Sequence, residues 1–386
     1  MYRTDDGPFD ATGAHARPDR PPHAWTSTGV HAGAPAIRAI RPALPAHGHD
    51  AATLSAALFD AWEVPATQRS RFERLHRAVG VRRRHLALPL DGYRDVASSF
   101  ARTNAAWLRV ASDLGCDAVR GALDAAGLRP RDVDQVFFTT VTGVAAPTVD
   151  VRVVNRLGMR SDTKRTPLFG LGCVGGAAGL ARAADYLRAF PDHVAVLLSV
   201  ELCSLTLQLD DRSTANVIAS GLFGDGAAAV VLGGAGRADA TAGPRVVASR
   251  SIFFRDTEDV MGWRIADTGF QVVLAAGIPA LVRDRLRAEV DAFLVSQGLV
   301  RDDVRHWVAH TGGPKVLQAM EASLELPPRA LARSWDSLAA NGNLSSASVL
   351  FVAADLLASG TARPGDVGLL LSMGPGFCGE LVLLRW

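Results

Sequence analysis

The sequence contains few cysteines, and no two of them stand at the CxxC spacing of a metal or redox site. The four thiols lie far apart in the chain, without a histidine-rich cluster beside them: Cys116, Cys173, Cys203 and Cys378. This pattern suggests neither a zinc ribbon nor a disulfide framework, so we expect no metal site. Unpaired cysteines also favour a reducing compartment, the cytoplasm.

The sequence also lacks an excess of either positive or negative charge. The chain has 41 basic and 39 acidic residues, a formal net charge of +2, so we expect neither a nucleic acid nor a membrane surface as a partner. No apolar run approaches the roughly 18 residues that a membrane span needs. The first residues carry Arg3, Asp5 and Asp6 in place of the apolar segment of a secretory signal. We therefore expect a soluble, cytoplasmic protein.

Apolar residues, by contrast, make up 48% of the chain, which is enough for a sizeable core. Residues 1–35 are rich in Pro, Ala, Gly and His without apolar periodicity, and we expect a disordered or loosely attached arm there. Beyond it, apolar spacing predicts helices over 52–81, interrupted at Pro65, and over 105–126, and strands over 136–141, 194–200 and 226–232. Strands that alternate with helices predict an α/β fold.

Cys173 lies where an apolar run interrupted by glycines becomes a helix, in the segment LFGLGCVGGAAGLARAADYL that begins at Leu168. Unpaired N–H groups at a helix N-terminus, together with the helix dipole, favour a thiolate, which is the nucleophilic form of cysteine. A buried structural cysteine is the other interpretation. The segment alone leaves both open, and the partners of a nucleophile must come from elsewhere in the chain.

Three pairs of segments are similar to one another at a separation of about 170 residues, which indicates an internal duplication. GLRPRDVDQVFF, from Gly127, is similar to GLVRDDVRHWVA, from Gly298. LGCVGGAAGLARAADYL is similar to NGNLSSASVLFVAADLL, which places Cys173 on Asn343. HVAVLLSV is similar to DVGLLLSM. If the two helix starts meet near a pseudo-twofold axis, Cys173 and Asn343 lie side by side.

The duplication predicts two halves. Residues 36–240 hold Cys173, residues 241–386 hold His310 and Asn343, and residues 233–243 are the expected linker. Residues 205–222 form an insertion in the first half that has no counterpart in the second. Such an insertion could shape a pocket or an oligomer interface.

His310 stands at the end of a strand-like segment and before Pro314, which can begin the next helix. A lone histidine there could be structural, but the repeat joins it to Cys173 and Asn343. A Cys–His pair, as thiolate and imidazolium, accepts an acyl group from a thioester. Two side-chain donors aimed at one oxygen can also stabilise an enolate or oxyanion, which suits carbon–carbon bond formation by decarboxylation.

Five motifs resemble those of the type III polyketide synthases, the chalcone and stilbene synthase superfamily. They are GCVGGAAGL around Cys173, LFGDGAAAVVLGG from Leu222, HTGGPKVL from His310, GNLSSASVLF from Gly342 and MGPGFCGELVLL from Met373. The resemblance runs in order from about residue 36 to residue 386. It implies the thiolase fold, a duplicated five-layered αβαβα arrangement, and a homodimer.

The resemblance also implies roles for individual residues. Cys173 matches the nucleophile that carries the acyl group, His310 its thiolate partner and enolate donor, and Asn343 the second donor. Phe223 and Phe270 match the two gatekeeping phenylalanines between the coenzyme A tunnel and the cavity. Four further residues align with positions that line the substrate cavity: Cys203, Thr206, Gly262 and Ser345.

A basic cluster precedes these motifs, with Arg71, Arg74 and Arg77 followed by three arginines at 82–84. Such a cluster can be a solvated helix face or a site for a small polyanion. The resemblance aligns Arg71 and Arg74 with basic residues that meet the phosphates of coenzyme A. A third basic position of the family falls on Ala78.

The implied reaction is iterative, with malonyl-CoA and an acyl-CoA starter as free CoA thioesters and no further cofactor. The segment ELCSLTLQLDD from Glu201 looks most like bacterial alkylresorcinol and alkylpyrone synthases, so we expect a medium- or long-chain fatty acyl-CoA starter. Cys203 also matches a cavity cysteine of naphthalene-forming members. The alternatives are a synthase that uses malonyl-CoA alone, of naphthalene or phloroglucinol type, a ketoacyl-acyl carrier protein synthase III, and a catalytically silent acyl-CoA-binding subunit.

Overall fold

The structure is a computed structural model that describes residues 33–237 and 243–386. The arm expected over residues 1–35 lies almost entirely outside the described residues. The boundary expected at residue 240 and part of the expected linker also lie outside them, so the division into halves stays a prediction. Of the described helices, none combines the length and apolarity that crossing a membrane would require.

Nine of the described strands form one mixed sheet that consists of two similar parts, and the other four form two small two-stranded sheets, β2 with β3 and β9 with β10. In the first part β4 pairs in parallel with β5 on one side and with β6 on the other. β7 then lies between β6 and β1 and pairs antiparallel with both. In the second, β11 and β12 are parallel and β13 and β8 follow antiparallel. The two parts meet where Ala36 of β1 pairs with Arg245 of β8. The strands are β1 (Ala36–Ala43), β4 (Gln135–Thr140), β5 (Lys164–Phe169), β6 (Val194–Leu202), β7 (Asp225–Gly233), β8 (Arg245–Phe253), β11 (Val304–Ala309), β12 (Val367–Gly374) and β13 (Cys378–Arg385).

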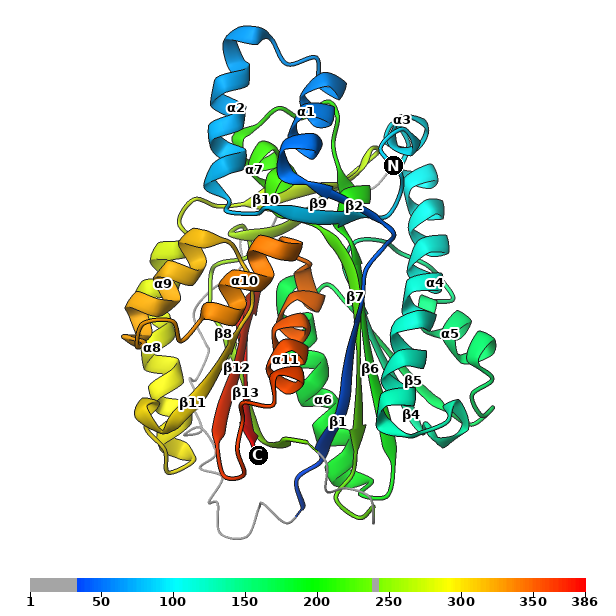
Figure 1. The fold of residues 1–386 in the computed structure, drawn as a ribbon, viewed down its shortest axis with the longest axis vertical. Helices are drawn as coiled ribbons and strands as arrows, with labels where there is room; N and C mark the ends of the chain where they lie inside the picture. Colours follow the sequence, from blue (N-terminus) through cyan, green and yellow to red (C-terminus); the bar gives the residue numbers. More distant parts are fainter. Residues whose placement is uncertain (1–32, 238–242) are drawn as a thin grey trace, which may run out of the picture.

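Helices cover both outer faces of this sheet and fill the space between its two parts (Figure 1). The central pair is α6 (Gly175–Ala189) and α11 (Ser348–Ser359). On the first part lie α4 (Phe100–Ala126) and α5 (Val149–Leu157). On the second lie α8 (Ile278–Ser296), α9 (Pro314–Leu324) and α10 (Ala332–Asn341). These are the five layers of the expected thiolase-like αβαβα fold.

Small residues allow the central layer to pack closely. A Cβ atom built on Gly176 of α6 would lie 2.1 Å from the carbonyl oxygen of Ser346, which lies in the second half's equivalent turn, η6 (Ser345–Ala347). Only glycine fits there, so the glycine-rich segment after Cys173 brings the two central helix starts together. The buried side chains around them, such as Leu180, Leu197 and Leu350, are fully removed from solvent.

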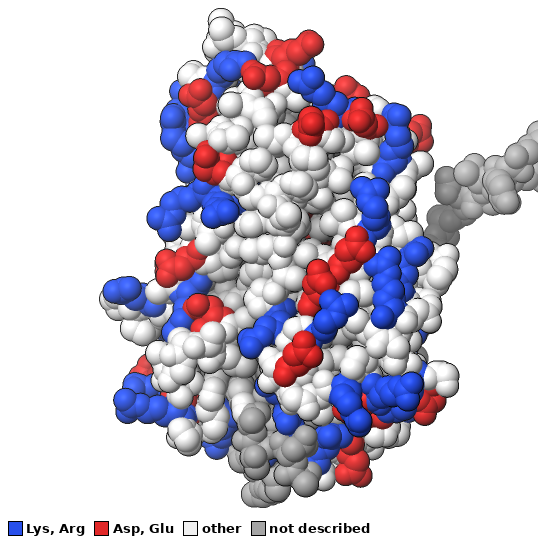
Figure 2. Space-filling model, turned by 45° about the vertical axis from the view of Figure 1, so that its right-hand side comes forward, with Lys and Arg blue, Asp and Glu red and all other residues white. Residues whose placement is uncertain are grey.

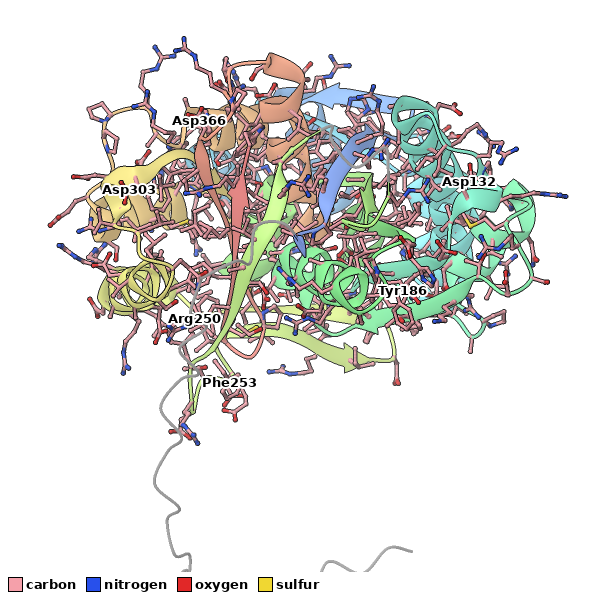
Figure 3. All side chains as sticks on the ribbon, turned by 90° about the horizontal axis from the view of Figure 1, so that it is seen from below. Asp132, Tyr186, Arg250, Phe253, Asp303 and Asp366 are labelled. Atoms are coloured by element: carbon pink, nitrogen blue, oxygen red, sulfur yellow. The ribbon has the colours of Figure 1, made fainter. Side chains whose placement is uncertain are left out.

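The internal repeat is visible in equivalent turns on opposite sides of the molecule. Asp132 accepts a hydrogen bond from the backbone N–H of Arg129 at 2.8 Å, and Asp303 accepts one from Val300 at the same distance. Each aspartate closes a short 3-10 turn before β4 or β11. Figure 3 shows the two carboxylates at the far right and far left of the view from below. The Asp-Val pair that both similar segments contain, at 132–133 and at 303–304, therefore belongs to one local structure built twice.

A smaller upper part of the molecule lies over the upper ends of the sheet strands (Figure 1). It contains the helices expected over 52–81, which the structure divides at Pro65, and the insertion expected over 205–222, which contains α7. Its elements are α1 (Ala51–Ala61), α2 (Ala66–Ala78), α3 (Gly92–Val96), α7 (Thr214–Leu222), β2 (His47–Asp50), β3 (Arg83–Leu86), β9 (Met261–Ala266) and β10 (Gly269–Leu274).

Surface charges are mixed in sign on the face that Figure 2 presents, where blue and red side chains alternate around white areas. This agrees with the small formal net charge of +2. A face of this kind has no extended field of one sign to attract a nucleic acid.

Candidate active site

Cys173 lies in the short 3-10 turn η3 (Gly172–Val174) that leads directly into α6. Its side chain is buried, at 6% exposure. The turn depends on Gly172, whose φ of 51° is left-handed and whose Cβ, if present, would lie 2.6 Å from Pro375. The sequence prediction of a cysteine at a helix start is confirmed.

Asn343 lies beside Cys173, as the repeat predicts. Its side-chain amide donates a hydrogen bond to the Cys173 sulfur over 4.0 Å, and its Oδ1 accepts one from the backbone of Ser345 at 2.8 Å. The second bond fixes which end of the amide faces the sulfur. The backbone of Asn343 is held by Leu222 and Gly224, at 2.9 and 3.0 Å. The end of α7 therefore positions this amide.

His310 follows β11 and is held through its backbone, which donates to Leu371 and accepts from Gly312 at 2.9 Å each. Its side chain is 2% exposed. Both ring nitrogens are buried without a hydrogen-bond partner among the described residues. A buried imidazole normally finds a partner, so this ring is free to bond a reacting group in the cavity that it lines.

One cavity of about 60 Å³ brings the three residues together, since Cys173, His310 and Asn343 all line it. Four other predicted site residues line the same cavity: Cys203, Phe223, Gly262 and Ser345. Phe270 lines neither this cavity nor the larger one beside it. It is 3% exposed and packs edge-on against Phe100, with ring centres 5.3 Å apart.

Two family profiles cover the chain. The N-terminal domain of the chalcone and stilbene synthases matches residues 24–236, and the C-terminal domain of the same family matches residues 245–386. The chain belongs to this family, the type III polyketide synthases. Enzymes of this kind are acyltransferases that act on CoA thioesters, as the sequence motifs implied.

Individual relatives agree with this assignment. The synthase is 53% identical to 1,3,6,8-tetrahydroxynaphthalene synthase of Streptomyces peucetius subsp. caesius, over 91% of this chain and 93% of the relative. It is 41% identical to a putative chalcone synthase of Bacillus subtilis (strain 168), over 66% and 71%. The solved structure of 1,3,6,8-tetrahydroxynaphthalene synthase from Streptomyces coelicolor A3(2), a bacterial type III polyketide synthase, matches with a TM-score of 0.85. That match has 29% identity and covers 91% of this chain and 99% of the other.

Burial sets the charge state of the synthase's cysteine and histidine. It raises the pKa of the Cys173 thiol to about 12, opposed by hydrogen bonds from Ser345 and Asn343, and lowers the pKa of His310 to about 3. A single charge on either group would lose its hydration. Burial therefore favours thiol and imidazole over the expected thiolate and imidazolium. Proton transfer from sulfur to ring leaves the net charge unchanged, so the two charges can form together.

A buried carboxylate behind the cavity was not singled out from the sequence. Glu201 accepts hydrogen bonds from Val141 N–H at 3.1 Å and the Thr142 hydroxyl at 3.0 Å, and from the Ser346 hydroxyl. Burial raises the pKa of Glu201 to about 6. These bonds join β6, the loop after β4 and the turn that follows Asn343. The sequence did contain a signal for this buried carboxylate, because an acidic residue stands near the end of the apolar run VAVLLSVEL.

A second and larger cavity, of about 440 Å³, adjoins the first. Cys203, Phe223, Trp263 and Val272 line both cavities. Thr206, predicted as a substrate-cavity residue, lines only the larger one. The space available to a substrate in this synthase is therefore mostly beyond Cys203 and Phe223, on the side of α1, α3 and α7.

The two arginines aligned with coenzyme A-binding positions lie outside these cavities. Arg71 and Arg74 are on the exposed face of α2, and Arg71 donates a hydrogen bond to Thr214 at the start of α7 over 3.1 Å. The neighbouring run of arginines does not form a solvated helix face: it enters β3, where Arg83 is exposed and Arg84 is buried. Nowhere in the described chain do three or more His, Cys, Asp or Glu side chains gather in a group that could hold a metal ion.

Proposed function

We propose that this synthase uses malonyl-CoA both as starter and as extender and forms a tetrahydroxynaphthalene-type product. The observation that carries the proposal is the 53% identity, over 91% of the chain, to a protein named 1,3,6,8-tetrahydroxynaphthalene synthase. The sequence alone favoured a fatty acyl-CoA starter and an alkylresorcinol or alkylpyrone product, with a malonyl-CoA-only synthase as an alternative. The relatives support that alternative.

In the proposed first step, the Cys173 sulfur attacks the thioester carbonyl of malonyl-CoA while His310 takes the thiol proton. The bond from the carbonyl carbon to the CoA sulfur breaks, and CoA leaves with a proton. An ionised thiol is the nucleophile, and the raised pKa of Cys173 makes a nearby base necessary. His310 suits this role because its ring nitrogens have no other partner among the described residues.

In the second step, a further malonyl-CoA loses carbon dioxide, and its enolate oxygen accepts hydrogen bonds from His310 and the Asn343 amide. The nucleophilic carbon attacks the acyl-Cys173 carbonyl, and the bond to the Cys173 sulfur breaks. Two donors fixed before the reaction stabilise the developing negative charge without reorganisation. The hydrogen bond from Ser345 to Asn343, at 2.8 Å, supports this role because it fixes the amide.

The growing chain is expected to extend into the larger cavity, because about 60 Å³ at Cys173 cannot hold several ketide units. We also propose that the synthase is a homodimer and acts in the cytoplasm. Phe169 at the end of β5 is 56% exposed and Val144 in the nearby loop is 40% exposed, which supports a contact there. Light scattering in solution tests the dimer, and a monomer at micromolar concentration would contradict it.

Mass spectrometry of the products tests the proposed function. The enzyme is incubated with malonyl-CoA alone and then with malonyl-CoA plus acyl-CoA starters from acetyl to stearoyl. We expect an aromatic product from malonyl-CoA alone. Products that appear only when a fatty acyl-CoA is added would refute the proposal and support the alkylpyrone or alkylresorcinol alternative.

Two cysteine variants test whether Cys173 is the nucleophile. Cys173→Ala is expected to abolish the product while coenzyme A still binds, because only the acyl-carrying sulfur is lost. Cys116→Ala is the matched control, since Cys116 is buried in α4 and lines neither large cavity. Full activity in Cys173→Ala would show that the nucleophile lies elsewhere.

A further inference from the structure

The larger cavity contains a buried charge that neither the reaction steps nor the family motifs above use. Its lining is mostly apolar, and three of the charged residues in it are exposed at its outer end: Asp60, Asp91 and Arg94. Arg84 of β3 also lines the cavity, but it is only 6% exposed. Burial lowers the pKa of its guanidinium to about 10, so the group is still positive at neutral pH.

The hydrogen bonds of Arg84 leave part of its guanidinium unused. Nη1 donates to the carbonyl oxygens of Ser220 and Phe223, at 2.5 and 2.7 Å, at the end of α7. Nε is buried and has no partner among the described residues. A buried guanidinium without a paired anion is costly, because charge loses its hydration and gains no ion pair in return.

The buried carboxylate of Asp225 does not fill this role. Asp225 attracts Arg84 over a distance, but its oxygens already accept hydrogen bonds from the backbone of Ala87 at 2.6 Å and of Ser204 at 2.7 Å, and from the Ser204 hydroxyl. No ion pair among the described residues includes Arg84. Because Arg84 lines the cavity, its guanidinium suits an anion that enters there.

Arg84 also stands beside the passage from the active site. Its Nη1 holds the backbone of Phe223, which lines both cavities, and its charge interacts with Cys203, which lines both as well. Cys203 lines the small cavity together with Cys173. A chain attached to Cys173 that passes Cys203 and Phe223 would thus bring its far end toward Arg84.

We propose that Arg84 binds the terminal carboxylate of a polyketide chain that began with a malonyl group. The idea rests on the proposed function, in which malonyl-CoA is the only substrate. Transfer of malonyl to Cys173 breaks one carbon–sulfur bond and forms another, and no carbon dioxide is lost. Each extender then loses its own carboxylate, so the chain keeps one carboxylate at its far end until ring closure, when this last carboxylate also leaves as carbon dioxide and the naphthalene product retains none. Arg84 pairs with that group and holds the chain extended in the larger cavity.

The same arrangement selects against an alkyl starter. A fatty acyl chain in this cavity would lie against Arg84 and leave the guanidinium buried and unpaired. A malonyl-primed chain supplies the missing anion. Arg84 is thus a specificity-determining residue for the starter, separate from the residues that perform the condensation.

The test compares starters within one variant, so that a general loss of folding does not decide it. Arg84→Met removes the charge and keeps most of the stem, and Arg84→Lys restores the charge. We expect Arg84→Met to lower kcat/KM for the product of malonyl-CoA alone by about 30-fold or more, as for the loss of one partner of a buried charge pair. For the product primed by hexanoyl-CoA, kcat/KM is expected to fall much less. Arg84→Lys is expected to recover part of the activity with malonyl-CoA alone. Arg83→Met, exposed on the same strand, is the control.

Equal losses with both starters would overturn the proposal and leave Arg84 a structural residue. Mass spectrometry of the acyl group trapped on Cys173 of the unaltered enzyme gives a second test that needs no variant. A malonyl group is expected, and an acetyl group would overturn the role of Arg84 while leaving a malonyl-CoA-only synthase intact. If malonyl-CoA alone gives no product, the proposed function itself fails.

Discussion

Gln208 holds the β9–β10 hairpin through hydrogen bonds of its side chain. Substitution of Gln208 should therefore make the hairpin, which lines both cavities, more mobile. The Gln208 side chain is 6% exposed. The amide donates to the carbonyl oxygens of Thr206, Thr268 and Phe270, at 3.3, 3.4 and 3.2 Å, and its Oε1 accepts from the Thr268 hydroxyl at 2.6 Å. The hairpin supplies Trp263 and Val272 to both cavities.

The perturbation is Gln208→Leu, which keeps similar bulk and removes every one of these bonds. Each buried group left without a partner costs about 1–3 kcal/mol, and the longer bonds lie at the low end, so we expect a loss of roughly 2–4 kcal/mol in the free energy of unfolding. The altered hairpin should also release shorter, incompletely extended products. Chemical denaturation measures the first effect and product mass spectrometry the second.

A double-mutant cycle with Thr268→Val isolates the shortest bond of this group. We expect the two changes to be non-additive by about 1 kcal/mol, because either one already breaks the bond between the Thr268 hydroxyl and Gln208. Additive effects, or an unchanged free energy of unfolding in Gln208→Leu, would refute the idea that this side chain holds the hairpin.

Three further predictions follow from the site. His310→Ala should slow alkylation of Cys173 by iodoacetamide at neutral pH by at least about tenfold, because the buried thiol, whose pKa burial raises, then has no nearby base to take its proton; an unchanged rate would show that His310 takes no part in ionising it. Gly172→Ala should lower the stability by about 2 kcal/mol or more, seen as a lower Tm, since alanine meets Pro375 at a left-handed φ. Burial raises the pKa of Glu201 from 4.5 to about 6, so the folded protein binds this proton more tightly than the unfolded chain does. The free energy of unfolding should fall as pH rises from about 4.5 to 6, and Glu201→Gln should lack that part of the slope.

Much of the active site could be predicted because the chain carries the same local structure twice. The similarity of the segments around Cys173 and Asn343 predicted that two helix starts meet, and the structure has the two side chains 4.0 Å apart. Strand patterns and the glycines of the first helix start were equally informative, since buried strands and close backbone approach restrict the residue types strongly.

Residues outside the repeat were harder to predict. Phe270, which stays a predicted gatekeeping phenylalanine, has a position that depends on packing against Phe100, far away in the chain. The arginines at 82–84 were taken together as one basic cluster. In β3 successive side chains point to opposite faces, so Arg83 is exposed while Arg84 is buried, and only the strand assignment distinguishes them.

The duplication separates the proposed chemistry from the proposed choice of starter in this enzyme. Cys173 and Asn343 occupy equivalent positions of the two repeats, so the proposed condensation site lies where the repeats meet, and any shift of one helix start moves the other. The larger cavity, by contrast, is built from α1, β3 and the segment 203–223, which lies largely in the insertion of the first half. Gln208 and Arg84 belong to these parts. Substitutions there can alter which starter and chain length are accepted without moving the sulfur, the imidazole or the amide, whereas the repeated segments tolerate few changes because each one must fit its counterpart.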